Sequence, residues 1–177
     1  MHKKVVITGG PGTGKSTVIA ALENKYTCMP EVSRSVTRDA QQRGIDQLFL
    51  HDPLVFSGLL LDERINQYEL ATEFANETIF FDRGIPDVMG YLEYLGVDYP
   101  DRFRSESLSK RYDIVFMMPP WEKIYQTDSE RYESFDQALI IFEKLKRTYS
   151  SLGYSYEIIP EATVDNRVEF ILNAIES

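Results

Sequence analysis

The sequence has little cysteine and no long apolar run. Among its 177 residues is one cysteine, Cys28, which excludes an internal disulfide and fits a reducing compartment. No apolar segment approaches the ~20 residues that span a bilayer, and the one near the start of the chain is too short for a signal peptide. We therefore expect a cytoplasmic protein without a membrane span.

The sequence also has fewer positive than negative charges. Nineteen lysines and arginines face 28 aspartates and glutamates, which gives a net charge of -9 at pH 7. A surface of this sign repels the phosphates of nucleic acids, so we expect no nucleic-acid partner, although a local basic pocket remains compatible with it. Hydrophobic residues at 43% and charged residues at 27% are typical of a globular protein. The length fits a single domain over residues 1–177.

Short apolar runs alternate with longer segments of helical periodicity. Asp52 followed by Pro53 predicts a helix start, and SFDQ at 134–137 forms a capping box. Strands separated by helices favour a three-layer α/β fold with a mostly parallel five-stranded sheet and helices on both faces. Ligands of such sheets bind beyond the carboxyl ends of the strands. The predicted strands are Lys4 to Thr8, Tyr26 to Pro30, Thr78 to Phe81, Asp113 to Met118 and Ser155 to Ile159.

The segment GGPGTGKS at 9–16 matches the phosphate-binding P-loop, G-x-x-x-x-G-K-[ST]. Glycines let several backbone N–H groups point at one phosphate, and the following helix start adds a positive dipole end. Lys15 is expected to reach the β- and γ-phosphates, and the Ser16 hydroxyl to bind Mg²⁺. The G-x-G-x-x-G dinucleotide motif does not fit, because Lys15 takes the place of its last glycine. The predicted nucleotide-binding residues are Gly9, Gly10, Pro11, Gly12, Thr13, Gly14, Lys15, Ser16 and Thr17.

A second apolar segment, TIFFDRG, ends in Asp82 followed by Arg83. An aspartate in this position is typical of a Walker B acid, which holds Mg²⁺ directly or through water. The alternative is a helix-capping aspartate after a core strand. Motor and remodelling ATPases usually carry a second acid after this aspartate, whereas an arginine fits phosphate or acceptor binding better than hydrolysis. We therefore predict catalytic roles for Asp82 and Arg83, with Asp82 also a metal ligand.

The segment CMPEVSRSVTRDA predicts a strand that ends at Glu31 and a helix that carries Arg34 and Arg38 four residues apart. In a small-molecule kinase, a carboxylate here can accept the proton of the attacking hydroxyl. The two arginines share a helical face and could bind the acceptor or a transferred phosphate. The alternative is a solvated helix end with ordinary charges.

A polar connection follows the fourth predicted strand, over residues 119–134. Connections of this length are commonly lids, and closure would exclude water and present Arg131 to the transferring phosphoryl group. The alternative is a surface loop that its aromatic residues anchor to the core. We favour that anchoring role for Trp121 and Tyr125, and a catalytic role for Arg131.

Six segments together resemble the NadR-like family of AAA-type P-loop ATPases, which itself resembles the nucleotide-binding domain of the retinal channel translocation-defect protein. The resemblance runs from Lys3 to about Leu172. The P-loop alone is shared by a vast superfamily, whereas the pairing of DRGIPDV with TDSERYESFDQA is much more specific. The segments are GGPGTGKST, PEVSR, FFDRGIPDV, PPW, YQTDSERYESFDQA and LGYSYEIIP.

This resemblance implies a nucleotide-kinase-like P-loop NTPase domain that binds ATP or GTP, and its relatives include ribosylnicotinamide kinase. By the same analogy, Gly9 to Thr17 bind the triphosphate, Asp82 is the Walker B acid and Arg131 is the lid arginine. Our leading hypothesis is a Mg²⁺-dependent phosphotransferase acting on a small, nucleoside-like, hydroxyl-bearing acceptor. The alternative is a nucleotide-dependent regulatory protein with slow hydrolysis. Acceptor-dependent ADP formation would discriminate between them.

Overall fold

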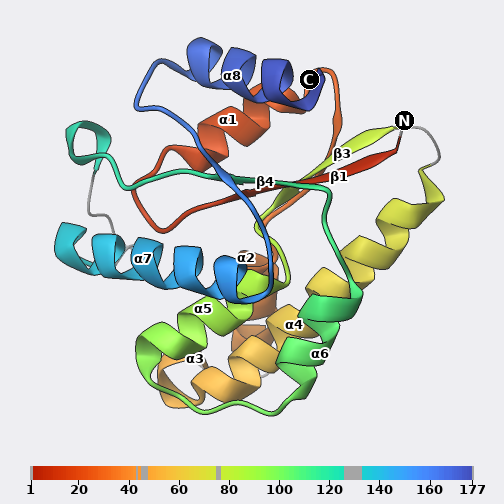
Figure 1. The fold of residues 1–177 in the computed structure, drawn as a ribbon. Helices are drawn as coiled ribbons and strands as arrows, with labels where there is room; N and C mark the ends of the chain where they lie inside the picture. Colours follow the sequence, from red (N-terminus) through yellow and green to blue (C-terminus); the bar gives the residue numbers. More distant parts are fainter. Residues whose placement is uncertain (1, 43, 45–47, 75–76, 126–132, 177) are drawn as a thin grey trace.

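Five parallel strands form the centre of the fold (Figure 1). The computed structural model describes residues 2–42, 44, 48–74, 77–125 and 133–176. The strand order is β2-β3-β1-β4-β5, and each neighbouring pair in this sheet is parallel. All five predicted strands are present, with ends shifted by one or two residues. They are β1 (Lys3–Thr8), β2 (Thr27–Met29), β3 (Thr78–Asp82), β4 (Ile114–Met117) and β5 (Glu157–Ile158).

Helices connect the strands, and the predicted start signals lie where they were expected. The Asp52 side chain accepts a hydrogen bond from the Val55 N–H at 3.0 Å and so caps α4. Ser134 and Gln137 form the reciprocal capping box of α7, with distances of 3.2 and 2.7 Å. The helices are α1 (Lys15–Leu22), α2 (Ser33–Gln42), α3 (Leu48–His51), α4 (Pro53–Leu70), α5 (Pro86–Leu95), α6 (Arg102–Ser109), α7 (Phe135–Ser151) and α8 (Val164–Glu176), with 3₁₀ turns η1 (Ala71–Glu73) and η2 (Glu122–Ile124).

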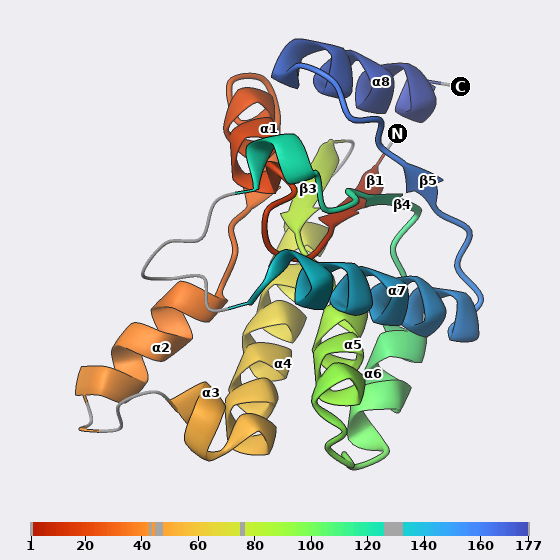
Figure 2. The same cartoon turned by 90° about the vertical axis from the view of Figure 1, so that its left-hand side faces the viewer.

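The helices cover both faces of the sheet, as the three-layer prediction requires. Helices α1 and α8 lie on one side, and α4, α5, α6 and α7 lie on the other (Figures 1 and 2). Because successive strand side chains alternate between faces, Val5 and Ile7 of β1 pack under α1 and α8 while Val6 packs in the opposite core. All three are fully buried, which explains why β1 has a continuous apolar sequence.

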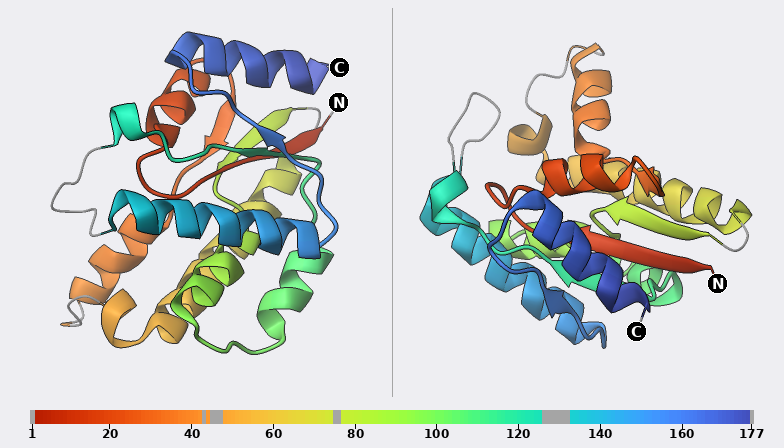
Figure 3. Two further views of the ribbon diagram at one scale, coloured as in Figure 1. Left: turned by 60° about the vertical axis from the view of Figure 1, so that its left-hand side comes forward. Right: turned by 90° about the horizontal axis from the view of Figure 1, so that it is seen from above.

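The carboxyl ends of β1, β2, β3 and β4 lie at one edge of this sheet, beside α2 and the start of α1 (Figure 3). The glycine loop follows β1, Glu31 follows β2, and Asp82 is the last residue of β3, so the parallel topology brings them to one edge of the sheet. In the part of the chain that the structure describes, no helix is both long enough and apolar enough to cross a bilayer.

Candidate active site

The glycine loop wraps one end of a cavity of about 820 Å³. Gly12 and Gly14 adopt φ angles of 72° and 76°, in the left-handed region that favours glycine. Gly14 is the N-cap of α1 and supplies no side chain to the first N–H groups of that helix. Residues 10–17 line the cavity, so these unsatisfied donors and the positive end of the helix dipole lie at its wall.

Close neighbours leave no room for a side chain at two glycines of the loop. A Cβ atom on Gly9 would lie 2.5 Å from the Met118 carbonyl oxygen, next to the end of β4. A Cβ atom on Gly12 would lie 2.0 Å from the ring of Tyr125, which also packs edge-on against Phe135 at 5.3 Å. The predicted anchoring role of Tyr125 therefore has a structural basis, because its ring packs on the glycine loop itself. Gly9 supports the loop and does not line the cavity.

Lys15 and Asp82 form a buried ion pair in the same cavity. Lys15 is 7% exposed, and its Nζ donates a hydrogen bond to Oδ1 of Asp82 at the end of β3. Burial lowers the pKa of Lys15, and the charge of Arg83 lowers it further, while Asp82 and Glu31 oppose both effects. The lysine and the aspartate thus neutralise each other.

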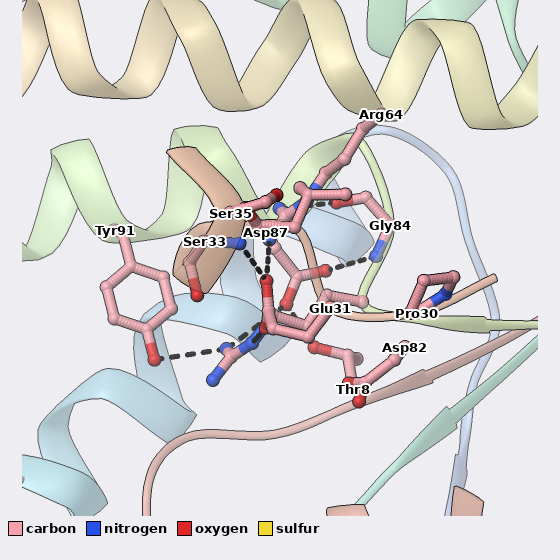
Figure 4. A network of polar contacts seen from close by, with 12 residues as sticks. Thr8, Pro30, Glu31, Ser33, Ser35, Arg64, Asp82, Gly84, Asp87 and Tyr91 are labelled. Atoms are coloured by element: carbon pink, nitrogen blue, oxygen red, sulfur yellow. Dashed lines mark hydrogen bonds and ion pairs between the residues drawn. The ribbon is translucent and has the colours of Figure 1, made fainter. Parts of the chain in front are cut away.

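A second ion-pair network surrounds Glu31 (Figure 4). Its carboxylate accepts hydrogen bonds from the Ser33 N–H at 3.1 Å, from Arg64 at 3.4 Å and from Nε of Arg83. Burial alone would raise the pKa of Glu31, but the positive charges of Arg83, Arg64 and Lys15 outweigh it and lower the pKa to about 2. Glu31 is therefore ionised at neutral pH and is held by two arginines.

Arg83 has an unusual backbone as well as a charged partner. Among the described residues it is the one non-glycine residue with positive φ, at 74°. Its backbone N–H donates to the Ile7 carbonyl at 3.0 Å, and its guanidinium donates to the Tyr91 hydroxyl at 3.1 Å. A left-handed backbone at a non-glycine residue costs roughly 1 to 3 kcal/mol and is concentrated at functional sites. The prediction that Arg83 contributes to the site thus gains an independent indication.

Asp87 contacts Arg83, and the sequence analysis did not single it out. It is completely buried and accepts hydrogen bonds from the Gly84 N–H at 2.9 Å, from the Tyr149 hydroxyl at 2.6 Å and from the Thr8 hydroxyl. Its Oδ1 lies 3.7 Å from the guanidinium of Arg83. The sequence signal was present in GIPD, where an acid stands in the first turn of α5.

Arg64 was missed as well. It is 3% exposed, and it donates to the Gly84 carbonyl at 2.9 Å in addition to Glu31. In the sequence it stands within the apolar stripe of α4, next to Leu60, Leu61 and Ile65. A single cation inside such a stripe is a signal that could have identified it, because a buried arginine needs partners.

A second, more apolar cavity of about 380 Å³ opens beside the first. Its walls include the apolar or aromatic residues Phe56, Leu60, Val88 and Tyr94, and the charged residues Arg64 and Asp87. Both cavities share one group of wall residues, which connects the glycine loop to the apolar cavity. The shared residues are Glu31, Ser33, Phe49, Arg83, Tyr91 and Glu133.

The remaining predicted residues are placed as follows. Arg34 and Arg38 are exposed on α2 and line the larger cavity opposite the glycine loop. Ser16 lines the same cavity with an exposed side chain. Arg131 lies outside the described residues, as do residues 126–132 of the predicted lid at 119–134.

Magnesium fits the donor atoms at this edge of the sheet. A hydroxyl from Ser16 and a carboxylate from Asp82 line one cavity, and Mg²⁺ takes such oxygen ligands together with phosphate and water. Within the described ranges no group of three or more histidine, cysteine, aspartate or glutamate side chains could hold a metal alone. Ser16 and Asp82 would hold the ion together with oxygen atoms of water and of a bound phosphate.

Comparison with solved structures supports the fold. Deoxyadenosine kinase from M. mycoides, with its products dCMP and dCDP bound, has a TM-score of 0.69 at 17% identity, and the match covers 98% of each chain. NadR in complex with NR has a TM-score of 0.72 at 17% identity, covering 99% of this chain and 51% of NadR. The chain thus spans about half the length of NadR.

Comparison with curated protein sequences gave no significant match. The predicted likeness to the retinal channel translocation-defect protein stays a prediction. The sequence matches a protein family described as AAA domain over residues 4–167. Since this match covers most of the chain, the protein belongs to the AAA domain family and carries an α/β P-loop fold like that of nucleoside kinases.

Proposed function

We propose that the chain forms one nucleotide-binding domain that transfers the γ-phosphoryl group of ATP or GTP to a small, nucleoside-like hydroxyl compound. The observation that carries this proposal is the shared wall between the two cavities. The larger cavity has the glycine loop and Lys15, while the smaller has apolar walls suited to a ring system. Glu31 and Arg83 lie between them, where an acceptor hydroxyl would meet the terminal phosphate.

The glycine loop holds the triphosphate through the N–H groups of the residues that line the cavity, within Gly10 to Thr17, and through Lys15, while Gly9 supports the loop. On nucleotide binding, the Lys15 ammonium exchanges Asp82 for phosphate oxygens. Asp82 and Ser16 would hold Mg²⁺, and the ion would supply positive charge to the β- and γ-phosphates. The ion pair of Lys15 with Asp82 keeps both side chains in the cavity.

Glu31 orients the acceptor, since a carboxylate with a pKa of about 2 is a weak base. It accepts the hydrogen bond of the attacking hydroxyl and directs the oxygen toward the γ-phosphate. Arg83, which already contacts Glu31, neutralises charge on the transferring group. Positioning and electrostatics supply most of the catalysis in phosphoryl transfer, so a strong base is not required. Arg34 and Arg38 bind the acceptor or its new phosphate, and Arg131 closes over the reaction.

The names of the structural relatives support a nucleoside-like acceptor. One is a deoxyadenosine kinase, and the other is NadR with NR bound. Slow hydrolysis without an acceptor would leave the apolar second cavity without a role, so we favour the transferase over the regulatory alternative.

The test is a screen of nucleosides and related metabolites for acceptor-dependent ADP or GDP formation. We expect at least one acceptor to accelerate diphosphate release and to gain the phosphoryl group. Diphosphate release that no acceptor stimulates would contradict the proposal.

Lys15→Ala provides the binding test. ATP at about 100 times its Kd should stabilise the wild type by roughly 2.7 kcal/mol, and this stabilisation should vanish in the variant. The control is Lys25→Ala, which removes an exposed lysine and should leave the stabilisation intact. Unchanged stabilisation in Lys15→Ala would show that the glycine loop is not the nucleotide site.

A further inference from the structure

Arg167 of α8 lies behind the glycine loop, on the side opposite the nucleotide cavity. It is 4% exposed and is not among the residues that line that cavity. Its guanidinium donates a hydrogen bond to the Thr13 carbonyl oxygen at 2.8 Å and stacks 4.7 Å from the ring centroid of Trp121. Thr13 and Arg167 are 154 residues apart in the sequence, so only the fold creates this contact.

The placement of Arg167 works against folding stability in three ways. It is buried without an ion pair to any described carboxylate, and its Nε has no hydrogen-bond partner in the described parts of the chain. Burial lowers the pKa of Arg167, and the charge of Glu161 opposes the shift only in part. It also stands in the first turns of α8, where the helix dipole repels a cation. A methionine or leucine would fill this position at a lower cost in folding free energy, so folding stability does not explain why a charged residue stands here.

The glycine loop supplies that explanation. In a trans peptide the C=O and the following N–H point in opposite directions, and the described chain contains no cis peptide. Arg167 holds the Thr13 carbonyl on the side away from the cavity, so the N–H of Gly14 in the same peptide unit is directed toward it. Gly14 itself leaves room for this contact, because a Cβ atom there would lie 3.0 Å from the Arg167 guanidinium.

We propose that Arg167 is a positioning residue for the phosphate-binding loop. It fixes the Thr13–Gly14 peptide so that the Gly14 N–H faces the nucleotide phosphates, and it adds an uncompensated positive charge behind the loop. Its target is a polyphosphate, because the loop has the sequence of the phosphate-binding P-loop. The inference rests on the proposed nucleotide-binding function.

Arg167→Met is the test variant, since methionine keeps the apolar packing on Trp121 but removes the charge and the donor. We expect the Kd for ATP to rise roughly tenfold to hundredfold, as for loss of a hydrogen bond to a charged group. The Kd for AMP, which lacks the β- and γ-phosphates, should change less than about threefold by the same reasoning. Trp121 is the single tryptophan of the chain, so its fluorescence reports both binding and the loss of the stacked guanidinium.

The matched control is Arg111→Met. Arg111 also stacks on an aromatic ring, 3.6 Å from the centroid of Tyr154, and also donates to a backbone carbonyl, that of Leu152 at 2.6 Å. It lies before β4, at the end of the strand that faces away from the glycine loop. We expect this variant to lower the melting temperature while ATP affinity stays within about threefold of the wild type, because it makes no contact with the loop.

Three results would overturn the inference. The first is an Arg167→Met protein that binds ATP as tightly as the wild type. The second is a loss of AMP affinity in Arg167→Met that equals its loss of ATP affinity. The third is a loss of ATP affinity in Arg111→Met that equals the loss in Arg167→Met. If Arg167→Met does not fold, Arg167→Lys becomes the test variant. Lysine keeps a hydrogen-bond donor and the positive charge, so ATP affinity should stay within about threefold of the wild type while the melting temperature falls. A tenfold loss in that variant would also contradict the inference. A wild-type protein that binds no nucleoside triphosphate would overturn the proposed function itself, which separates the two failures.

Discussion

Replacing Glu31 with glutamine removes the negative charge that Arg83 and Arg64 share. The pKa of Glu31 is lowered from 4.5 to about 2, and each pKa unit corresponds to about 1.36 kcal/mol, so the difference of about 2.5 gives roughly 3 kcal/mol. The side chain is 18% exposed, so solvent screening reduces this figure only modestly. We expect Glu31→Gln to lower the free energy of unfolding by roughly 3 kcal/mol at pH 7, since two buried arginines lose their counterion.

The sign of the pH dependence follows from the direction of the shift. A carboxylate whose pKa is depressed in the folded state contributes its full stabilisation above the unfolded pKa of 4.5 and loses it as the pH falls through 2. The difference in unfolding free energy between wild type and variant should therefore shrink to roughly 1.5 kcal/mol at pH 3.

The assay is urea-induced unfolding of both proteins at pH 7 and at pH 3. Glu63→Gln, which changes an exposed carboxylate on the same helix as Arg64, is the control and should differ from wild type by less than about 0.5 kcal/mol. An equal difference for Glu31→Gln at the two pH values would refute the electrostatic reasoning, as would a difference below about 1 kcal/mol at pH 7.

Two further substitutions address the reaction. Asp82→Asn should abolish Mg²⁺-dependent turnover. It should also lower the free energy of unfolding, measured without nucleotide, by roughly 3 kcal/mol, because Lys15 stays buried without its counterion. Turnover measured across a Mg²⁺ titration checks the metal role of Asp82, and an active variant would contradict it. Arg131→Ala should reduce kcat roughly a hundredfold while the Kd for ATP stays within about threefold. A collapse of ATP affinity with unchanged kcat would eliminate the lid proposal.

The glycine loop and the helix starts were predictable from the sequence because their signals are local. Gly12, Gly14 and Lys15 stand at fixed spacing between an apolar strand and a helix, and the capping box of Ser134 and Gln137 lies within four residues. Such patterns depend on backbone conformations and hydrogen bonds between near neighbours, which the residue types themselves dictate. The five parallel strands followed from the same alternation of short apolar and longer helical segments.

The partners of the predicted residues were not predictable. From the sequence, Glu31 was a candidate to accept the proton of the attacking hydroxyl or an ordinary charge at a helix end. The fold pairs it with Arg83 and Arg64, which are 52 and 33 residues away. These pairs depend on how far each helix extends along the sheet, and no local sequence pattern determines that extent. Arg64 and Asp87 were missed for the same reason, because each joins the candidate site only through a neighbour contributed by another element.

The sequence by itself determined the glycine loop on which the proposed phosphate binding depends, since a backbone that can curl around an anion needs only glycines, a lysine and a helix start in order. The tertiary structure alone decided what surrounds that loop. Parallel strand order brought Glu31 and Asp82 to one edge, α4 and α5 added the apolar cavity beside them, and α8 set Arg167 behind Thr13. Contacts between residues far apart in the chain arise from packing, and packing is fixed only when the whole core forms.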